Sequence, residues 1–296
     1  MRVNPNYTPE LLSSLWNVEQ QEQNDILELT TGRRVNEPSD DPAAAAADVE
    51  NQAAQSQNDQ YEQNTTDLEG MFQTAQSTIS SVVTALNQAI SIGTEGANSG
   101  LSSSNLQTMT GEVQDIQKQV VSLANTSYEG AYLFAGTANT QPFTLDSSQA
   151  SGVQYNGNSE TNTVAIADGS TMQSNVSGSQ LFLGSSGSVM GSLQQLVTAL
   201  QSGNSTSIGD ATTAVSTALN YLSQGSGFYN SGLSQLDSNQ TFLQQETVNL
   251  KTQDNSLVGV DEATAATDLS QAETAQSASL AAIAKVIPQS LLNYLQ

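Results

Sequence analysis

The sequence predicts a mainly α-helical protein with a β insertion: coiled-coil helices at the N- and C-termini, an elongated helical bundle, and a small, mostly β domain. Apolar residues recur every three or four positions over long stretches, which is typical of helices packed along a seam. Between residues 136 and 187 the chain changes to short β-prone pieces. Of the 296 residues 36% are hydrophobic and only 5% aromatic, which is lean for a compact globule and favours an elongated shape.

The two ends of the chain each carry a thin apolar stripe, and the first is interrupted by Glu22 and Asp25. Burying a seam side chain yields roughly 1.5–3 kcal/mol, whereas ordering each residue costs about 1.5 kcal/mol, and only about a third of the positions are apolar. We therefore expect both ends to be largely disordered in a free monomer and to become helical when neighbouring copies bury them. The predicted assembly residues are Leu11, Leu15, Val18, Ile26, Leu29, Leu269, Leu280, Ile283, Ile287, Leu291 and Tyr294.

The first terminal helix is predicted to end within GRRVNEPSDDPAAAAA, residues 32–47. Gly32 follows the last stripe residue and suits a C-cap, which requires a left-handed backbone. Arg33 and Arg34 then lie near the negative end of the helix dipole. One helix is expected to stop here.

A second helix is predicted to begin a few residues later. Pro38 restricts the residue before it and prevents continuation of the first helix. Asp41 followed by Pro42 is typical of an N-cap and first turn. Local capping accounts for the charged residues and argues against a separate metal or phosphate site. The predicted interdomain joint comprises Gly32, Arg33, Arg34, Pro38, Asp40, Asp41 and Pro42.

The strongest helical stripes lie in the middle of the chain, over residues 68–90 and 106–123. Gly93, Gly96 and Gly100 separate these two and predict a turn. Shorter stripes follow at 189–200 and 208–222, and a long one runs from Tyr229 to Leu257. The long stripe has polar residues at three seam positions, Gln240, Thr247 and Asp254. All of these stripes are interpreted as the core of a helical bundle.

The predicted β insertion contains the pieces PFTL, VQY and TVAIA, separated by Gly, Asn, Ser and Asp. Its acids Asp146, Glu160 and Asp168 lack the alternating spacing of a calcium loop, which favours solvated turns. The sequence thus divides into three predicted domains: 1–34 with 258–296 (terminal coiled coil), 35–135 with 188–257 (helical bundle), and 136–187 (mostly β).

Composition excludes several functional classes. Six Lys and Arg against 29 Asp and Glu give a formal net charge of −23, which repels nucleic acid and anionic membranes. The absence of His and Cys excludes imidazole and thiolate catalysis, zinc sites with those ligands, and disulfides. The N-terminus has no uninterrupted apolar run typical of a cleaved signal peptide, and no stretch is long enough to span a bilayer. We expect no cofactor, no metal and no enzymatic activity.

Three passages resemble the flagellin-related hook–filament junction proteins. The first is TTGRRVNEPSDDPAA at the joint. The second is GAYLFAGT from Gly130, followed by Pro142-Phe143 and then Val153, Tyr155 and Gly157. The third is the end of the chain, ATDLSQAETAQSASLAAIAKVIPQSLLNYL. The resemblance covers both ends and the middle of the chain.

Two positions depart from the family pattern. Asn4-Pro5 stands where the family has an uninterrupted polar start. Pro288 lies within the last helix and is expected to kink or end it, because proline removes a backbone donor.

The resemblance implies a structural subunit of the bacterial flagellum. Such proteins leave the cell unfolded through the flagellar type III export channel and assemble outside it as a ring of identical subunits. The implied partners are the preceding hook-associated protein, flagellin on the filament side, and a cytosolic chaperone that holds the C-terminal segment. In that arrangement the terminal helices line an inner tube, the bundle forms the wall, and the β insertion faces outward.

Other functions stay open on the sequence alone. Flagellin itself shares the terminal helices, although the sequence motifs PSDDPAA and YLFAGT favour the junction protein. A surface adhesin with a glycan-binding β module is a different class, for which Tyr155 is the one obvious aromatic platform. A glycosidase-like carboxylate pair would be chemically possible, but the sequence supplies no such pairing.

Overall fold

The computed structural model describes residues 7–185 and 187–294, and the side chains of residues 9–185 and 187–285. The chain forms two compact units, each assembled from segments that are distant in sequence. The first unit comprises residues 1–58 and 245–296, and the second comprises residues 59–244. Two long helices, α2 (Pro42–Gly96) and α7 (Gly227–Val258), contribute to both units.

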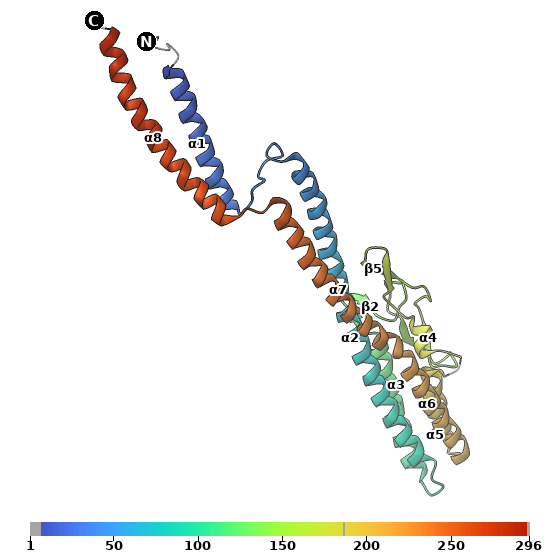
Figure 1. Ribbon diagram of the computed structural model, residues 1–296. Helices are drawn as coiled ribbons and strands as arrows, with labels where there is room; N and C mark the ends of the chain where they lie inside the picture. The colour runs from blue at the N-terminus through green and yellow to red at the C-terminus, as the bar shows by residue number, and fades with distance from the viewer. Residues whose placement is uncertain (1–6, 186, 295–296) are drawn as a thin grey trace. The chain divides into compact units, whose positions relative to one another are not determined.

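The first unit contains two helix pairs. The terminal helices α1 (Tyr7–Thr31) and α8 (Glu262–Tyr294) pack against each other and run in opposite directions (Figure 1). The beginning of α2 and the end of α7 are joined by side-chain hydrogen bonds. Asn51 Nδ2 donates to the Leu250 carbonyl at 3.0 Å, and Asn58 Nδ2 donates to Thr247 Oγ1 at 2.8 Å. Polar side chains therefore occupy the seam of this second pair.

The second unit is built around an apolar core. The remaining parts of α2 and α7 join α3 (Ser103–Ala124), α5 (Val189–Ser202) and α6 (Ser205–Gly225). Helix α5 packs on both α3 and α6. Large side chains such as Phe72, Leu86, Leu193 and Tyr229 are almost completely buried. Burial of these side chains supplies the main driving force for this unit.

The β region consists of three separate antiparallel hairpins and one short helix. The hairpins pair β1 (Ser127–Tyr128) with β2 (Ala131–Tyr132), β3 (Phe143–Leu145) with β4 (Val153–Tyr155), and β5 (Thr163–Ala167) with β6 (Ser170–Gln173). Helix α4 (Gly178–Phe182) follows them. The first hairpin turns at Glu129 and Gly130. Both residues have positive φ, as the two central residues of a type I′ turn require.

An aromatic cluster packs the second hairpin against α4, and Asn125 connects this cluster to the end of α3. The Phe143 ring contacts those of Phe182 and Tyr155, with centroids 5.6 and 5.0 Å away. Asn125, at the end of α3, bonds the Phe143 backbone twice: it accepts from the N–H and donates to the C=O, both at 2.8 Å. One side chain thereby satisfies both polar groups of a buried strand residue.

Most predicted elements are confirmed, and some of them differ in extent from what was expected. The stripes at 106–123, 189–200, 208–222 and 229–257 are all helices, and PFTL, VQY and TVAIA all contribute strands. The helix expected over 43–47 and the stripe at 68–90 are parts of one helix, α2. The β1–β2 hairpin precedes the predicted start of β structure at residue 136, and helix α4 lies within that segment.

Pro288 was expected to kink or end the last helix, and the ending is wrong, because α8 continues to Tyr294. A proline removes one backbone donor, and the other hydrogen bonds of the helix can still form around it. In the described part of the chain, no helix combines the length and the apolar character that crossing a membrane would require.

A close approach between α2 and α7 offers a test of the core. Gly232 on α7 lies against Phe72 on α2, and an added Cβ would collide with the Phe72 ring and lie 2.8 Å from Met172 Cε. We expect Gly232→Ala to lower the free energy of unfolding by about 1–3 kcal/mol. Gly209→Ala on α6, where a Cβ meets open space, should instead raise it by roughly 0.5–1 kcal/mol. Urea unfolding followed by circular dichroism measures both, and equal effects would contradict the packing.

Candidate functional site

The joint of the first unit consists of two short segments, residues 32–41 and 259–261, that lie side by side. Gly32 ends α1 with a left-handed backbone, φ +69°, and its N–H donates to the Glu28 carbonyl at 2.8 Å. Arg33 and Gly259 form an antiparallel bridge, in which the Arg34 N–H donates to the Val258 carbonyl at 2.7 Å. The Val260 N–H donates in turn to the Gly32 carbonyl at 3.1 Å. The two connections therefore hold each other by backbone hydrogen bonds.

An aspartate N-cap begins each helix that leaves the joint. Asp41 Oδ1 accepts from the Ala44 N–H at 3.0 Å, and Asp261 Oδ1 accepts from the Ala263 N–H at 3.0 Å. These bonds satisfy amide groups that have no partner inside the helix. The Ala44 N–H and Arg34 outweigh desolvation and lower the pKa of Asp41. The N-cap predicted at Asp41 and the C-cap predicted at Gly32 are thus present in the structure.

Asp40 folds the loop that contains Pro38. Its Oδ2 accepts from the N–H groups of Asn36 and Glu37, at 3.0 and 2.9 Å. Asn36 Nδ2 donates to the Arg33 carbonyl at 2.7 Å. The loop is therefore closed by its own side chains, as the local interpretation of these residues predicts.

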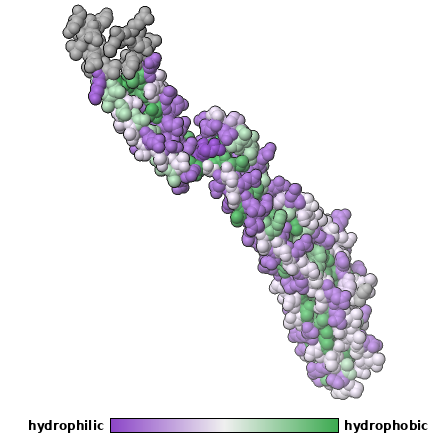
Figure 2. All heavy atoms as spheres, in the orientation of Figure 1, coloured by the Kyte–Doolittle hydropathy of each residue, from purple (hydrophilic) through white to green (hydrophobic). Residues whose placement is uncertain are grey.

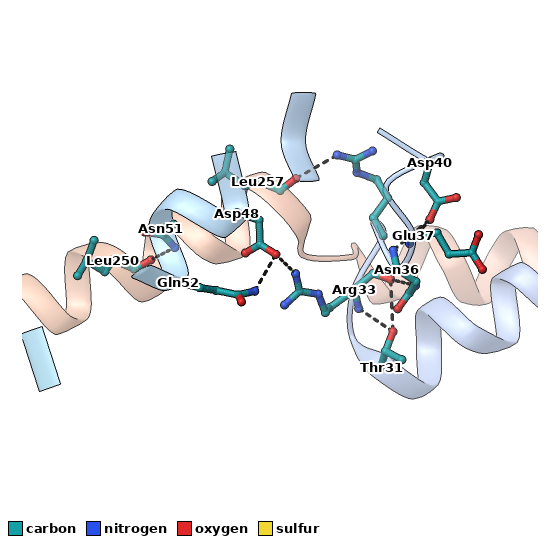
Figure 3. Close-up of polar contacts among 11 residues, drawn as sticks. Thr31, Arg33, Asn36, Glu37, Asp40, Asp48, Asn51, Gln52, Leu250 and Leu257 are labelled. Carbon is teal, nitrogen blue, oxygen red and sulfur yellow. Dashed lines mark hydrogen bonds and ion pairs between the residues drawn. The ribbon is translucent and has the colours of Figure 1, made fainter. Parts of the chain in front are cut away.

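Arg33 connects the joint to α2, which the sequence did not indicate. Its guanidinium forms an ion pair with Asp48, whose side chain is only 9% exposed (Figure 3). The same Asp48 oxygen, Oδ2, accepts from Gln52 Nε2 at 2.9 Å. We expected Arg33 to serve the end of α1, but it pairs with a residue 15 positions further along the chain. No feature of the sequence around Arg33 indicated Asp48 as its partner.

Arg34 connects the joint to α7. Its guanidinium donates to the Leu257 carbonyl at 3.1 Å and lies 3.4 Å from Asp41 Oδ2. Leu257 is in the last turn of α7, where carbonyls lack intrahelical partners and the helix dipole is negative. Arg34 therefore supports the end of α7, and its charge also acts on Glu28 near the end of α1.

The predicted assembly residues divide into a covered seam and an exposed part. Leu11, Leu15, Val18, Leu29, Leu269 and Ile283 are half-buried, whereas Ile26 and Leu280 are exposed. Ile287, Leu291 and Tyr294 belong to α8, but their side chains lie outside the described residues.

An exposed apolar stripe on α1 was missed by the sequence reasoning, except for Ile26, which was among the predicted assembly residues. It consists of Leu12, Trp16, Ile26 and Leu27, all exposed, with Trp16 72% exposed. Helical spacing places these four on one face, displaced by one residue from the seam that contacts α8. Figure 2 shows hydrophobic residues reaching the surface along the terminal helices. We call this set the outer stripe.

Asp25 lies inside the seam between α1 and α8. Its side chain is 3% exposed, and its Oδ1 accepts from Gln21 Nε2 at 2.8 Å. Its Oδ2 is buried with no hydrogen-bond partner among the described residues. One turn later, burial together with the carboxylates of Asp25 and Asp40 raises the pKa of Glu28, against the opposing effect of Arg34. Negative charge is therefore concentrated beside the weakest packing of the unit.

Other candidate sites are not assembled. Among the described residues no group of three or more acidic side chains is placed to hold a metal ion. Asp146 accepts instead from the Ser148 N–H and Oγ, at 2.9 and 2.6 Å, within a local turn. The Tyr155 ring packs on Phe143 and its hydroxyl donates to backbone carbonyls, so it does not form an open platform for a sugar.

Comparison with known proteins gives matches at both ends of the chain. The model of the bacterial flagellin N-terminal helical region matches residues 6–139, and that of the C-terminal helical region matches residues 212–295. Flagellar hook-associated protein 3 of Salmonella typhimurium is 34% identical over 157 residues, which is 52% of this chain and 48% of that protein. Its Escherichia coli counterpart is 36% identical over 118 residues, or 39% and 37% of the two chains. The matches thus span about half or less of these relatives.

Solved structures show the same fold. FlgL from Bacillus cereus aligns with a TM-score of 0.60 and 23% identity, covering 70% of this chain and 99% of that one. The flagellar junction protein FlgL from Legionella pneumophila aligns with a TM-score of 0.59 and 15% identity, covering 72% and 100%. A mainly helical chain with long terminal helices and a small β region is therefore the fold of these proteins too.

The Arg33 ion pair is testable by removal of the guanidinium. Arg33→Met leaves the buried Asp48 carboxylate without its cation, and we expect the free energy of unfolding to fall by about 1–2 kcal/mol. The loss is smaller than for a fully buried pair, because 34% of the Arg33 side chain is exposed. Lys118→Met, which removes the exposed Lys118–Asp115 pair, should have no measurable effect. Urea unfolding and amide exchange over residues 32–58 measure the change, and equal behaviour of the two variants would contradict it.

Proposed function

The chain belongs to the flagellin-related family, and from this premise we propose that it is a structural subunit of the bacterial flagellum that forms the junction between hook and filament. The observation that carries the proposal is the match of both chain ends to flagellin helical regions, together with the pairing of those ends as α1 and α8. The names of the curated relatives favour a hook-associated protein over flagellin itself. The relatives are structural proteins of the flagellum, and we assign no catalytic role to this chain.

We propose that the subunits assemble through their terminal helices into a ring. The seam residues hold α1 and α8 together, and the outer stripe supplies apolar surface for a neighbouring subunit. Exposed apolar stripes of this kind are typical of interaction surfaces. The proposed partners in the assembled state are further copies of the chain, the preceding hook-associated protein and flagellin.

Export is part of the same proposal. The chain would leave the cell unfolded through the flagellar type III pathway, with a cytosolic chaperone on its C-terminal segment, and would function outside the cell. A first unit with little buried apolar surface suits this route, because such a unit costs little to unfold. The absence of cysteine also fits, since no disulfide has to form after export.

We further propose that the joint allows limited angular change between the terminal domain and the helical bundle of the assembled ring. The three-part division of the chain at residues 34/35, 135/136, 187/188 and 257/258 is part of this proposal. The joint residues would then adapt a flexing hook to a stiffer filament.

The function is tested by deletion of the gene in its own organism. We expect hooks without filaments and monomeric flagellin in the medium, because flagellin then lacks a platform on which to polymerise. Purified chain, added with flagellin and the preceding hook-associated protein, should restore filament growth on isolated hooks. Loss of flagellin from the medium would identify the chain as flagellin instead, and normal filaments in the deletion strain would exclude both functions.

The marginal stability of the terminal helices is tested on the monomer. Of the described side chains in α1 and α8, those buried are Asp25, Ala265 and Ala272, so the pair gains little from burial. We expect weak amide protection over residues 9–31 and 262–285 in the wild type. Asp25→Leu should increase protection by about 1–3 kcal/mol, because it removes a buried oxygen without a partner.

Gln23→Leu is the matched control, because it adds the same side chain at an exposed position of α1. It should leave protection unchanged in the monomer. Full protection of both helices in the wild-type monomer would refute the idea that assembly completes their folding.

A further inference from the structure

Two carboxyl groups face each other where α2 and α7 approach the joint. The Asn51–Leu250 hydrogen bond sets α2 and α7 in an antiparallel register, in which Asp48, one turn before Asn51, lies opposite Asp254, one turn after Leu250, and the two carboxyls interact. Asp48 Oδ2 is already engaged by the Arg33 guanidinium and by Gln52 Nε2 (Figure 3). Asp48 Oδ1 is buried without an N–H or O–H partner, which leaves it for Asp254. Because ionised carboxylates only accept hydrogen bonds, this contact requires a proton on one of the two groups.

The charges around the pair identify which group carries the proton. Arg33 is the cation that faces both carboxyls, and it forms its ion pair with Asp48. Asn51, one turn from Asp48, contributes an amide that stabilises the Asp254 carboxylate, but it also donates to the Leu250 carbonyl. Arg34 is directed elsewhere, to the Leu257 carbonyl and Asp41. A single guanidinium therefore compensates one carboxylate, and Asp254 is the group that remains.

We propose that Asp254 is protonated and donates to Asp48 Oδ1 in the closed form of the joint, and that release of this proton to solvent separates the end of α7 from Asp48. In the closed form, Asp48 connects three parts of the first unit. Its Oδ2 holds Arg33 of the joint and its Oδ1 holds Asp254 of α7, while its own backbone belongs to α2. Without the proton, two carboxylates share one guanidinium and repel each other.

The pKa shifts of the two groups support the placement of the proton on Asp254. Burial and the adjacent Asp48 carboxylate raise the pKa of Asp254, and Arg33 and Asn51 only partly oppose the shift. Burial also acts on Asp48, but the hydrogen bond from Asp254 and the ion pair with Arg33 outweigh it and lower the pKa of Asp48. The two groups titrate as a pair, with one apparent pKa on each side of the ordinary aspartate value.

The sign of the pH dependence follows from these two shifts. Asp254 binds its proton more tightly in the folded joint, so the joint gains stability as pH falls through its raised pKa. Asp48 binds its proton less tightly in the folded joint, so this stability is lost again as pH falls through its lowered pKa. The joint is therefore most firmly closed at a pH between the lowered pKa of Asp48 and the raised pKa of Asp254, and it loosens as the pH rises above the pKa of Asp254. This inference depends on the geometry of the pair and not on the proposed function.

The test uses the full-length chain and two measurements. NMR follows the carboxyl carbons of the aspartates as a function of pH. Amide exchange is measured over residues 255–261, and the exchange rates are corrected for their intrinsic pH dependence. In the wild type, protection of these amides should increase on acidification by up to about tenfold for each unit by which the Asp254 pKa is raised. Asp254→Asn supplies a permanent amide donor to Asp48 Oδ1, and should give high protection that does not change over the same pH range. Asp254→Ala removes the donor and should give low protection throughout.

Asp210→Asn, an exposed acid on α6, is the matched control and should titrate like the wild type. An unshifted Asp254 carboxyl, or a pH dependence of Asp254→Asn equal to that of the wild type, would overturn the proposal. Addition of millimolar Ca²⁺ or Mg²⁺ separates a proton from a bound cation. If either ion raised protection at neutral pH and shifted the Asp48 and Asp254 signals, a cation rather than a proton would bridge the pair, and the proposal would be wrong.

Discussion

The shortage of buried apolar surface in the first unit is the constraint on which the rest of its structure depends. Among its described side chains, the buried apolar ones are Val35, Leu250, Val258, Ala265 and Ala272, and the buried polar ones are nearly as many: Asp25, Asp48, Asn51 and Asn58. The second unit instead buries a continuous cluster of large side chains. Because hydrophobic burial is the main favourable term in folding, the first unit relies on directed polar contacts more than the second unit does.

Directed contacts define position more sharply than they add stability. Asn58 with Thr247 and Asn51 with the Leu250 carbonyl fix the register of α2 against α7, because a shift of either helix would leave buried polar groups without partners. Arg33 and Arg34 extend this control to the joint by contacting α2 and α7 respectively. Under the proposal above, a joint built in this way opens and closes in the same register, because the same buried polar groups must find their partners again.

The sequence predicted those features that depend on neighbours close along the chain. Apolar stripes at helical spacing located the bundle helices, and Gly32 and Asp41 marked the joint because a left-handed C-cap and an aspartate N-cap are local requirements. Partners distant in sequence could not be predicted in this way, and Arg33 with Asp48 is the clearest example. The part of α2 between residues 48 and 67 was missed because its seam is polar, so the apolar periodicity that identifies helices is absent there. The polar seam positions Thr247 and Asp254 were noticed, but their meaning required knowledge of Asn58 and Asp48 opposite them.

Pairing with α8 leaves several large apolar side chains of α1 uncovered. The face toward α8 includes the buried carboxylate of Asp25, and the buried residues it meets on α8 are alanines. Trp16, Leu12 and Leu27 point away from this seam. Full burial of such side chains contributes about 1.5–3 kcal/mol each, so most of the stabilisation available to α1 lies on its uncovered face. Had the same residues faced α8, the pair of terminal helices would bury more apolar surface by itself and would gain less stability from a neighbouring molecule. Placed outward, they are available for contact with another molecule, and under the proposed function such contact would couple order in the terminal helices to assembly.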